Sequence, residues 1–192
     1  MNDINKAKFI SNEDIIMEPN DILKTTSVPV KIPLSSEDKH LLKLLYNHVS
    51  NSQDEEYCKK YNIRSAVGIA AIQIGINKRL LAVKTKLDDE NIFKYALANP
   101  VYLYKSKQMC YLNPTEGCLS VDDTRYQGLV PRHYHIQVEG FNLLTNKKEI
   151  IDVKGFNAIV LQHEMDHLDG ILYIDRINKL DFNYKKDDWI AV

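Results

Sequence analysis

The stretch of the sequence that decides the fold is LQHEMDHLDG, residues 161–170, in which His163 and His167 stand four residues apart. Glu164 directly follows the first histidine. On a helix, residues four apart lie on one face at about 6 Å from each other, so both imidazoles could ligate one divalent metal ion. The spacing therefore predicts a helix that carries a metal site, with Glu164 beside the metal.

The residues around this stretch predict where the helix begins and ends. Gly155 precedes the segment FNAIVLQHEMDHL, residues 156–168, in which apolar residues and the two histidines recur at helical spacing. Gly170 supplies a C-terminal stop. We expect the metal-binding face of this helix to be buried.

The rest of the chain predicts one further long helix and a series of strands. The segment SSEDKHLLKLLYNHV, residues 35–49, begins with serines and acidic residues and continues with leucines at helical spacing, which is typical of an amphipathic helix. The polar residues 51–62 could form a second short helix or a loop. Strands are expected at residues 79–83, 95–104, 135–138 and 149–153, the last two joined as a hairpin around residues 144–147. Consecutive strands favour an α+β fold in which antiparallel β-sheets pack around the late helix.

The composition fits a single catalytic domain over residues 1–192. Because 25 Lys and Arg balance 26 Asp and Glu, no overall basic field argues for direct nucleic-acid binding or for an anionic membrane surface. The first twenty residues mix charges of both signs, which excludes a signal peptide, and no apolar run approaches membrane-spanning length. We therefore expect a cytoplasmic protein, in which three cysteines are too few for a disulfide framework.

The third metal ligand separates the classes of metallohydrolase. No glutamate follows Glu164, and Tyr173 stands where the longer HExxHxxGxxH peptidase pattern has its final histidine. Upstream, the segment EGCLS, residues 116–120, offers Cys118, whose thiolate is a good ligand for iron or zinc. A site of Cys118, His163 and His167 would leave a fourth position open for water, which is typical of a catalytic metal site.

Two other readings of these residues stay open at this point. The first is a metallopeptidase, although neither peptidase pattern is complete. The second is a closed structural site in which Cys110 is a fourth ligand, and it predicts unfolding on chelation and no role for Glu164. The simpler role of Cys110 and Cys58 is packing. The remaining histidines have no spacing typical of metal ligands and are read as surface or core residues: His40, His48, His133 and His135.

Three separated motifs carry a family resemblance. The segments VGIAAIQ, residues 67–73, EGCLS, residues 116–120, and QHEMDH, residues 162–167, occur in the order found in peptide deformylases. The chain resembles that family over most of its length, and in particular its longer bacterial class. It departs from the family pattern at Ala66, where a glycine is usual, and at Ile72, where proline is common.

The resemblance implies a reaction and a set of roles. The reaction is removal of the N-formyl group, as formate, from the N-terminal formyl-methionine of newly synthesised proteins. The implied cofactor is one Fe²⁺ per chain, for which Zn²⁺, Ni²⁺ or Co²⁺ can substitute, and the attacking group is a metal-bound hydroxide. Glu164 would act as general base and then general acid. The Gln73 side-chain amide and the Leu119 N–H would stabilise the oxyanion.

The resemblance also implies a substrate site and two partners. The peptide would lie extended against Val67 and Gly68 and near Gly117. The methionine pocket would draw on Val67, Phe156 and Ile159, with Val160 closer to a core residue. An ion pair of Glu116 with Arg132 would steady the Cys118 loop, and Asp166 would orient neighbouring groups. The partners are N-formyl-methionyl nascent polypeptides and, as a second candidate, the ribosome near its exit tunnel.

Overall fold

The computed structural model describes residues 9–86, 91–122 and 124–192, and within these ranges it has an α+β fold, as expected. The expected domain also includes residues 1–8, 87–90 and 123, which lie outside the described residues. The α-helices are α1 (Ser36–Asn51), α2 (Glu55–Tyr61) and α3 (Gly155–Leu168). In the part of the chain that the structure describes, no helix is long and apolar enough to cross a bilayer.

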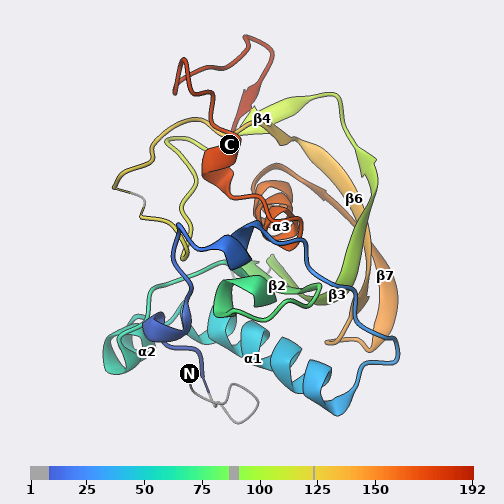
Figure 1. The fold of residues 1–192 in the computed structure, drawn as a ribbon. Helices are drawn as coiled ribbons and strands as arrows, with labels where there is room; N and C mark the ends of the chain where they lie inside the picture. The colour runs from blue at the N-terminus through green and yellow to red at the C-terminus, as the bar shows by residue number, and fades with distance from the viewer. Residues whose placement is uncertain (1–8, 87–90, 123) are drawn as a thin grey trace.

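The larger sheet has five strands in the order β1-β2-β3-β6-β7, and each neighbouring pair is antiparallel. Its strands are β1 (Gly68–Ala70), β2 (Leu80–Lys86), β3 (Ile92–Lys105), β6 (His135–Asn142) and β7 (Lys147–Lys154). The expected hairpin is confirmed, because β6 and β7 pair around a turn at residues 143–146 in which Asn146 has a positive φ. Figure 1 shows this sheet curving around α3.

A second sheet has three strands in the order β5-β4-β8: β4 (Met109–Tyr111), β5 (Arg132–His133) and β8 (Ile190–Ala191). Unlike the antiparallel arrangement expected throughout, β4 and β8 are parallel, with Cys110 opposite Ile190. Parallel neighbours need a long connection, and here most of the second half of the chain, α3 included, separates the two strands. Pairing between such distant segments leaves no local pattern in the sequence.

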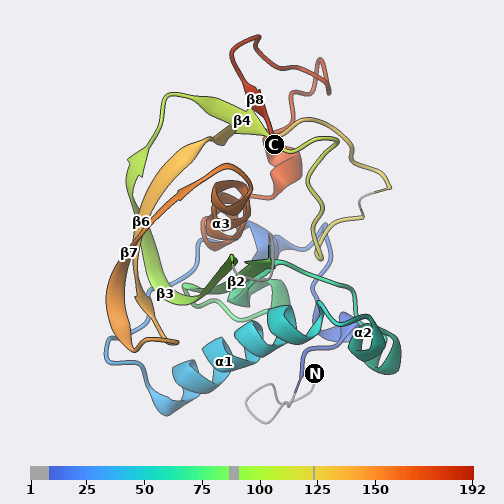
Figure 2. The same cartoon turned by 180° about the vertical axis from the view of Figure 1, so that it is seen from behind.

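Strand β2 is buried on both faces because a helix covers each side of the sheet. Leu80 and Ala82 join the hydrophobic cluster that contains the buried apolar residues of α1. Leu81 and Val83, which alternate with them, join the cluster built on α3. Figures 1 and 2 show β2 between α1 and α3 from both sides. The two helices therefore fix the position of the sheet from opposite faces.

Local signals explain how α1 and α2 begin. The Ser35 side chain accepts a hydrogen bond of 3.0 Å from the Asp38 N–H, which caps the first turn of α1. The Asp54 side chain accepts from the N–H groups of Glu56 and Tyr57, which caps α2. The sequence is compatible with either a short helix or a loop at residues 51–62, and the structure has a short helix there.

Helix α3 is buried almost all round, as a helix in the centre of a domain must be. Its C-terminal end is covered by the N-terminal segment, since the Ser27 N–H donates to the Leu168 carbonyl at 2.7 Å. Gly170 follows with a φ of +72°, and a Cβ there would lie 2.5 Å from the Lys24 carbonyl oxygen. Only glycine fits both the backbone conformation and this contact.

Candidate metal centre

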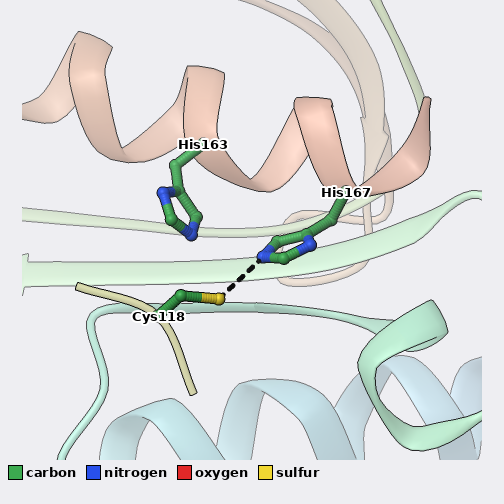
Figure 3. Close-up of side chains that lie close together, drawn as sticks. All are labelled: Cys118, His163 and His167. Carbon is green, nitrogen blue, oxygen red and sulfur yellow. Dashed lines mark hydrogen bonds between the residues drawn. The ribbon is translucent and has the colours of Figure 1, made fainter. Parts of the chain in front are cut away.

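Three side chains from two distant segments converge beside α3. The potential ligand atoms of Cys118, His163 and His167 all lie within 4.8 Å of one another, and all three residues are buried. Figure 3 shows both imidazoles on successive turns of α3 pointing toward the Cys118 thiol, which comes from a separate loop. The sequence predicted this set from spacing and residue type, and the fold brings its members together.

His163 is oriented by a carboxylate. Its Nδ1 lies 2.8 Å from Glu116 Oε2, so the other ring nitrogen, Nε2, is the one left to ligate an ion. Burial alone would lower the pKa of His163, but hydrogen bonds and charges from Cys118 and Glu116 raise it well above the ordinary value. The negative charge around this imidazole thus favours a cation at its Nε2, either a proton or a metal ion that displaces the proton.

The pKa of His167 is shifted in the opposite direction from that of His163. Burial lowers its pKa well below the ordinary value, and the positive charges of His163 and Arg132 lower it further, so its ring is neutral. Neutral imidazole is the form that ligates metal ions. Its Nε2 lies 3.3 Å from Cys118 Sγ (Figure 3), and within the described residues its buried Nδ1 has no hydrogen-bond partner.

The donor set fits a catalytic divalent metal. A thiolate and two imidazoles match iron or zinc, and three protein ligands leave room for water or substrate. Cys110 is not part of the cluster that the described residues form; it lies buried in β4, opposite Arg132. The hypothesis of a closed structural site with four protein ligands therefore lacks its fourth ligand. His133 and His135 contact Ser106 and Asp152 instead, in keeping with ordinary structural roles.

A buried network of charges contacts the candidate metal ligands. The Arg132 side chain is only 2% exposed and donates to both oxygens of Glu116 at 2.7 and 2.8 Å. It also donates to Asp166 on α3, which accepts two further hydrogen bonds from Arg176. Burial would raise the pKa of Glu116, but the Arg132 charge and hydrogen bonds lower it to about 2. Glu116 thus links this network to His163.

The amide of Gln73 has a fixed orientation. Its Oε1 accepts a hydrogen bond of 2.8 Å from the Ala70 N–H, and only the oxygen of an amide can accept. Its Nε2 therefore faces the other way, 3.2 Å from Ser120 Oγ and 3.7 Å from Cys118 Sγ. Gln73 presents a donor at the edge of the metal cluster.

A second donor lies on the same side of the cluster. Leu119 is in the turn that follows Cys118, and its carbonyl oxygen accepts a hydrogen bond from Arg64. Within the described part of the chain, its N–H makes no hydrogen bond, whereas the neighbouring Ser120 N–H donates to Cys118 Sγ. An unpaired backbone N–H next to a pocket is available to a ligand.

The Glu164 carboxylate lies against the backbone of β1. It is 4% exposed, and burial raises its pKa to about 7. Its Oε2 has no hydrogen-bond partner in the described ranges. A Cβ on Gly68 would lie 2.3 Å from Glu164 Oε1 and 2.7 Å from the carbon next to it, so Gly68 leaves the space that this carboxylate fills.

These residues surround a pocket of about 340 Å³. Every residue expected to contact substrate lines it, namely Val67, Gly68, Gly117, Phe156, Ile159 and Val160, together with Gln73, Cys118, Leu119, His163 and Glu164. Glu116 also lines it, whereas His167, Arg132 and Asp166 are not among its described lining residues. Sequence reasoning missed Arg64, Ser65 and Leu112 as lining residues. The first two lie three and two residues before the VGIAAIQ motif, whereas Leu112 carries no signal of its own.

A family model described as polypeptide deformylase matches residues 12–183. The chain belongs to the peptide deformylase family. Peptide deformylases are metalloenzymes, and membership makes the chain a hydrolase that deformylates peptides. The family resemblance seen in the three sequence motifs is confirmed.

Relatives and solved structures match over nearly the whole chain. A peptide deformylase of Halalkalibacterium halodurans is 42% identical over 180 residues, 93% of this chain and 97% of the relative. Peptide deformylase 2 of Geobacillus stearothermophilus is 43% identical over 173 residues, 90% of this chain and 93% of the relative. The crystal structure of a class I type b peptide deformylase from Acinetobacter baumannii with Met-Ala-Ser bound has a TM-score of 0.66 at 30% identity, and covers 85% of this chain and 96% of that one.

We predict that Gly68→Ala reduces deformylase activity because the added methyl group displaces the Glu164 carboxylate. A displacement of about 1 Å in a reacting group can lower the rate by about 10²-fold. Formate release from a formyl-methionyl peptide measures the effect, and Gly140→Ala in β6 is the control, since its Cβ would meet its nearest neighbour at 3.4 Å. Full activity in Gly68→Ala would contradict this role of the glycine.

Proposed function

We propose that Cys118, His163 and His167 hold one Fe²⁺ at the bottom of the pocket, and that Zn²⁺, Ni²⁺ or Co²⁺ can replace it. The donor set supports iron and zinc alike, and the choice of iron follows the family resemblance. When bound, such an ion acidifies water and polarises the formyl group. The remaining steps depend on side chains and backbone groups that the fold places around the pocket.

Glu164 is the proton carrier in this proposal. Its carboxylate lines the same pocket as His163, and its Oε2 makes no hydrogen bond within the described residues, so that oxygen can accept a proton from water. The same oxygen can then donate the proton to the departing amine nitrogen of the peptide. Gly68 holds the carboxylate in place by leaving room for it.

Gln73 and Leu119 are the proposed oxyanion donors. The Gln73 Nε2 is fixed by the bond between its Oε1 and Ala70, and the Leu119 N–H is unpaired within the described residues. Both residues line the pocket beside Cys118. Donors fixed before the reaction stabilise the developing charge without a reorganisation cost.

The peptide is proposed to lie along the outer edge of β1, near Val67, Gly68 and Gly117. Strand β1 is the first strand of its sheet, so its outer edge can pair with an extended peptide backbone. The apolar side chains of Phe156, Ile159, Val160 and Leu112 line the same pocket and suit a methionine side chain. Because backbone hydrogen bonds do not depend on side chains, peptides with many different residues after the methionine could bind in this way.

Glu116, Arg132 and Asp166 are proposed to position the metal ligands. The Glu116 carboxylate orients His163, and Arg132 connects Glu116 to α3 through Asp166. Such outer partners fix the ring orientation and basicity of a ligating histidine. The network therefore supports the site without contacting the substrate.

We also propose that residues 1–192 form a single catalytic domain that works in the cytoplasm. The family model spans residues 12–183, and α1 and α3 belong to two hydrophobic clusters that both contain residues of β2. Formyl-methionyl polypeptides, the substrate class of the family, emerge in the cytoplasm. The ribosome near its exit tunnel is the second proposed partner, because the nascent substrate leaves it there.

The observation that carries this proposal is the convergence of Cys118, His163 and His167 at a pocket that Cys118, His163 and Glu164 line. The test is formate release from a short formyl-methionyl peptide by protein prepared without oxygen and loaded with Fe²⁺. We expect release with Fe²⁺ and, at altered rates, with Zn²⁺, Ni²⁺ and Co²⁺. Absence of formate from protein with a measured full metal content would contradict the proposal.

Removal of the metal gives a further prediction. A chelator should abolish formate release while the far-ultraviolet circular dichroism stays native, because the large clusters on α1 and α3 hold the fold without the ligand side chains. Adding Fe²⁺ back should restore activity. Cooperative unfolding on chelation would instead favour a structural metal site.

A further inference from the structure

Arg64 has no role in the mechanism above, yet it contacts one of the two proposed oxyanion donors. Its Nη2 donates a hydrogen bond to the Leu119 carbonyl oxygen, and both residues line the pocket. The Leu119 N–H and the Leu119 carbonyl flank the same Cα, so a bond to the carbonyl restricts how far the N–H can turn. We infer that Arg64 is a positioning residue for the Leu119 amide, an inference that rests on the proposed function.

The turn from Cys118 to Ser120 lies in no helix or strand, and its own backbone hydrogen bond, from the Val121 N–H to the Cys118 carbonyl, is long at 3.4 Å. On the Arg64 side, the guanidinium holds the Leu119 carbonyl. The next carbonyl, that of Ser120, accepts a hydrogen bond of 2.8 Å from the Glu18 N–H. Two consecutive peptide groups of the turn are therefore held by two different segments of the chain.

Arg64 is itself anchored to the N-terminal segment. Its own N–H donates to Asn12 Oδ1 at 3.1 Å, and Asn12 Nδ2 donates to the Asn62 carbonyl at 2.6 Å. The Met17 sulfur lies 3.9 Å from the Arg64 guanidinium. The side chain therefore extends from a fixed backbone, which lets a long and exposed arginine position another group.

The same N-terminal segment reaches the other proposed donor. The Ile16 N–H donates to the Gln73 carbonyl at 2.7 Å. Ile15 packs in the cluster that contains Leu119, and Ile16 packs against the cluster that contains Cys118. Residues 12–18 thus connect Arg64, Gln73 and the 118–120 turn, so loss of one connection should affect the geometry of the donors.

The test compares Arg64→Met, which keeps much of the side-chain length and loses every donor, with Arg64→Lys, which restores one donor. Both are assayed for kcat and KM with a formyl-methionyl tripeptide at equal metal content, beside the wild-type protein. Lys43→Met, an exposed charge change on α1, is the control. We expect kcat to fall about tenfold in Arg64→Met, with KM within twofold of wild type and partial recovery in Arg64→Lys.

A second variant tests the anchoring. Asn12→Ala should lower kcat in the same direction, and the double variant with Arg64→Met should be no slower than Arg64→Met alone, because both changes act on one contact. Three results would overturn the inference. The first is an unchanged kcat in Arg64→Met, and the second is a rise in KM alone, which would indicate direct contact with the substrate. The third is additive effects on kcat in the double variant. Absence of activity in the wild-type protein would instead contradict the proposed function.

Discussion

Glu164→Gln is expected to lose between about 10²- and 10⁴-fold in kcat for formate release, the range typical of a lost general acid–base. Glutamine keeps the shape of the side chain, so the space beside Gly68 stays filled and the metal ligands keep their positions. It cannot take a proton from water or return one to the amine. The variant should therefore bind metal and peptide at wild-type levels and fail in turnover.

The measurement is single-turnover and steady-state formate release at a metal content determined for each sample. Glu56→Gln, an exposed carboxylate at the start of α2, is the control and should retain full activity. If Glu164→Gln turned over at more than about a tenth of the wild-type rate, another group would have to move the proton. Loss of metal from the variant would show that Glu164 also contributes to holding the ion.

Arg132→Met is expected to destabilise the protein by about 3–5 kcal/mol, because the buried Glu116 carboxylate loses its guanidinium partner and Asp166 keeps only that of Arg176. Arg132 lies between Glu116 and Asp166, and both carboxylates are buried. For a chain of this size, such a loss lowers Tm by roughly 6–20 °C. Thermal unfolding followed by circular dichroism measures it, with Arg125→Met in an exposed ion pair as the control.

A triple variant separates charge from packing. Arg132→Met combined with Glu116→Gln and Asp166→Asn also removes the negative charges of both buried carboxylates, so it should regain most of the lost stability. It should remain poorly active, since the neutral amide that replaces the Glu116 carboxylate no longer offers His163 a negative charge. A Tm in Arg132→Met equal to that of wild type would show that Asp166 and Glu116 do not depend on this arginine.

The sequence predicted the parts of the site that belong to a local sequence pattern. Helix α3 was predicted from its spacing, and Cys118 followed from the failure of the other third-ligand patterns. The spacing of His163 and His167 is a local property of one helix, so it is visible without the fold. The same holds for the cap at Ser35 and for the hairpin between β6 and β7.

Other parts depend on contacts between distant segments. Arg64 reaches Leu119 across 55 positions, and nothing in the residues near Arg64 indicates that partner. Arg176 reaches Asp166 only because the chain turns back after α3. The room that Gly68 leaves for Glu164 is likewise a property of the packed structure, since a glycine in a strand can serve several purposes.

The separation of the ligands along the chain also sets when the site can form during synthesis. Cys118 is made before the helix that carries His163 and His167, and the N-terminal segment that braces the pocket is made first of all. Chains emerge from the ribosome in this order. A growing copy therefore has no complete metal site until α3 has emerged and packed onto β2. Only copies that have already folded can remove formyl groups from other chains.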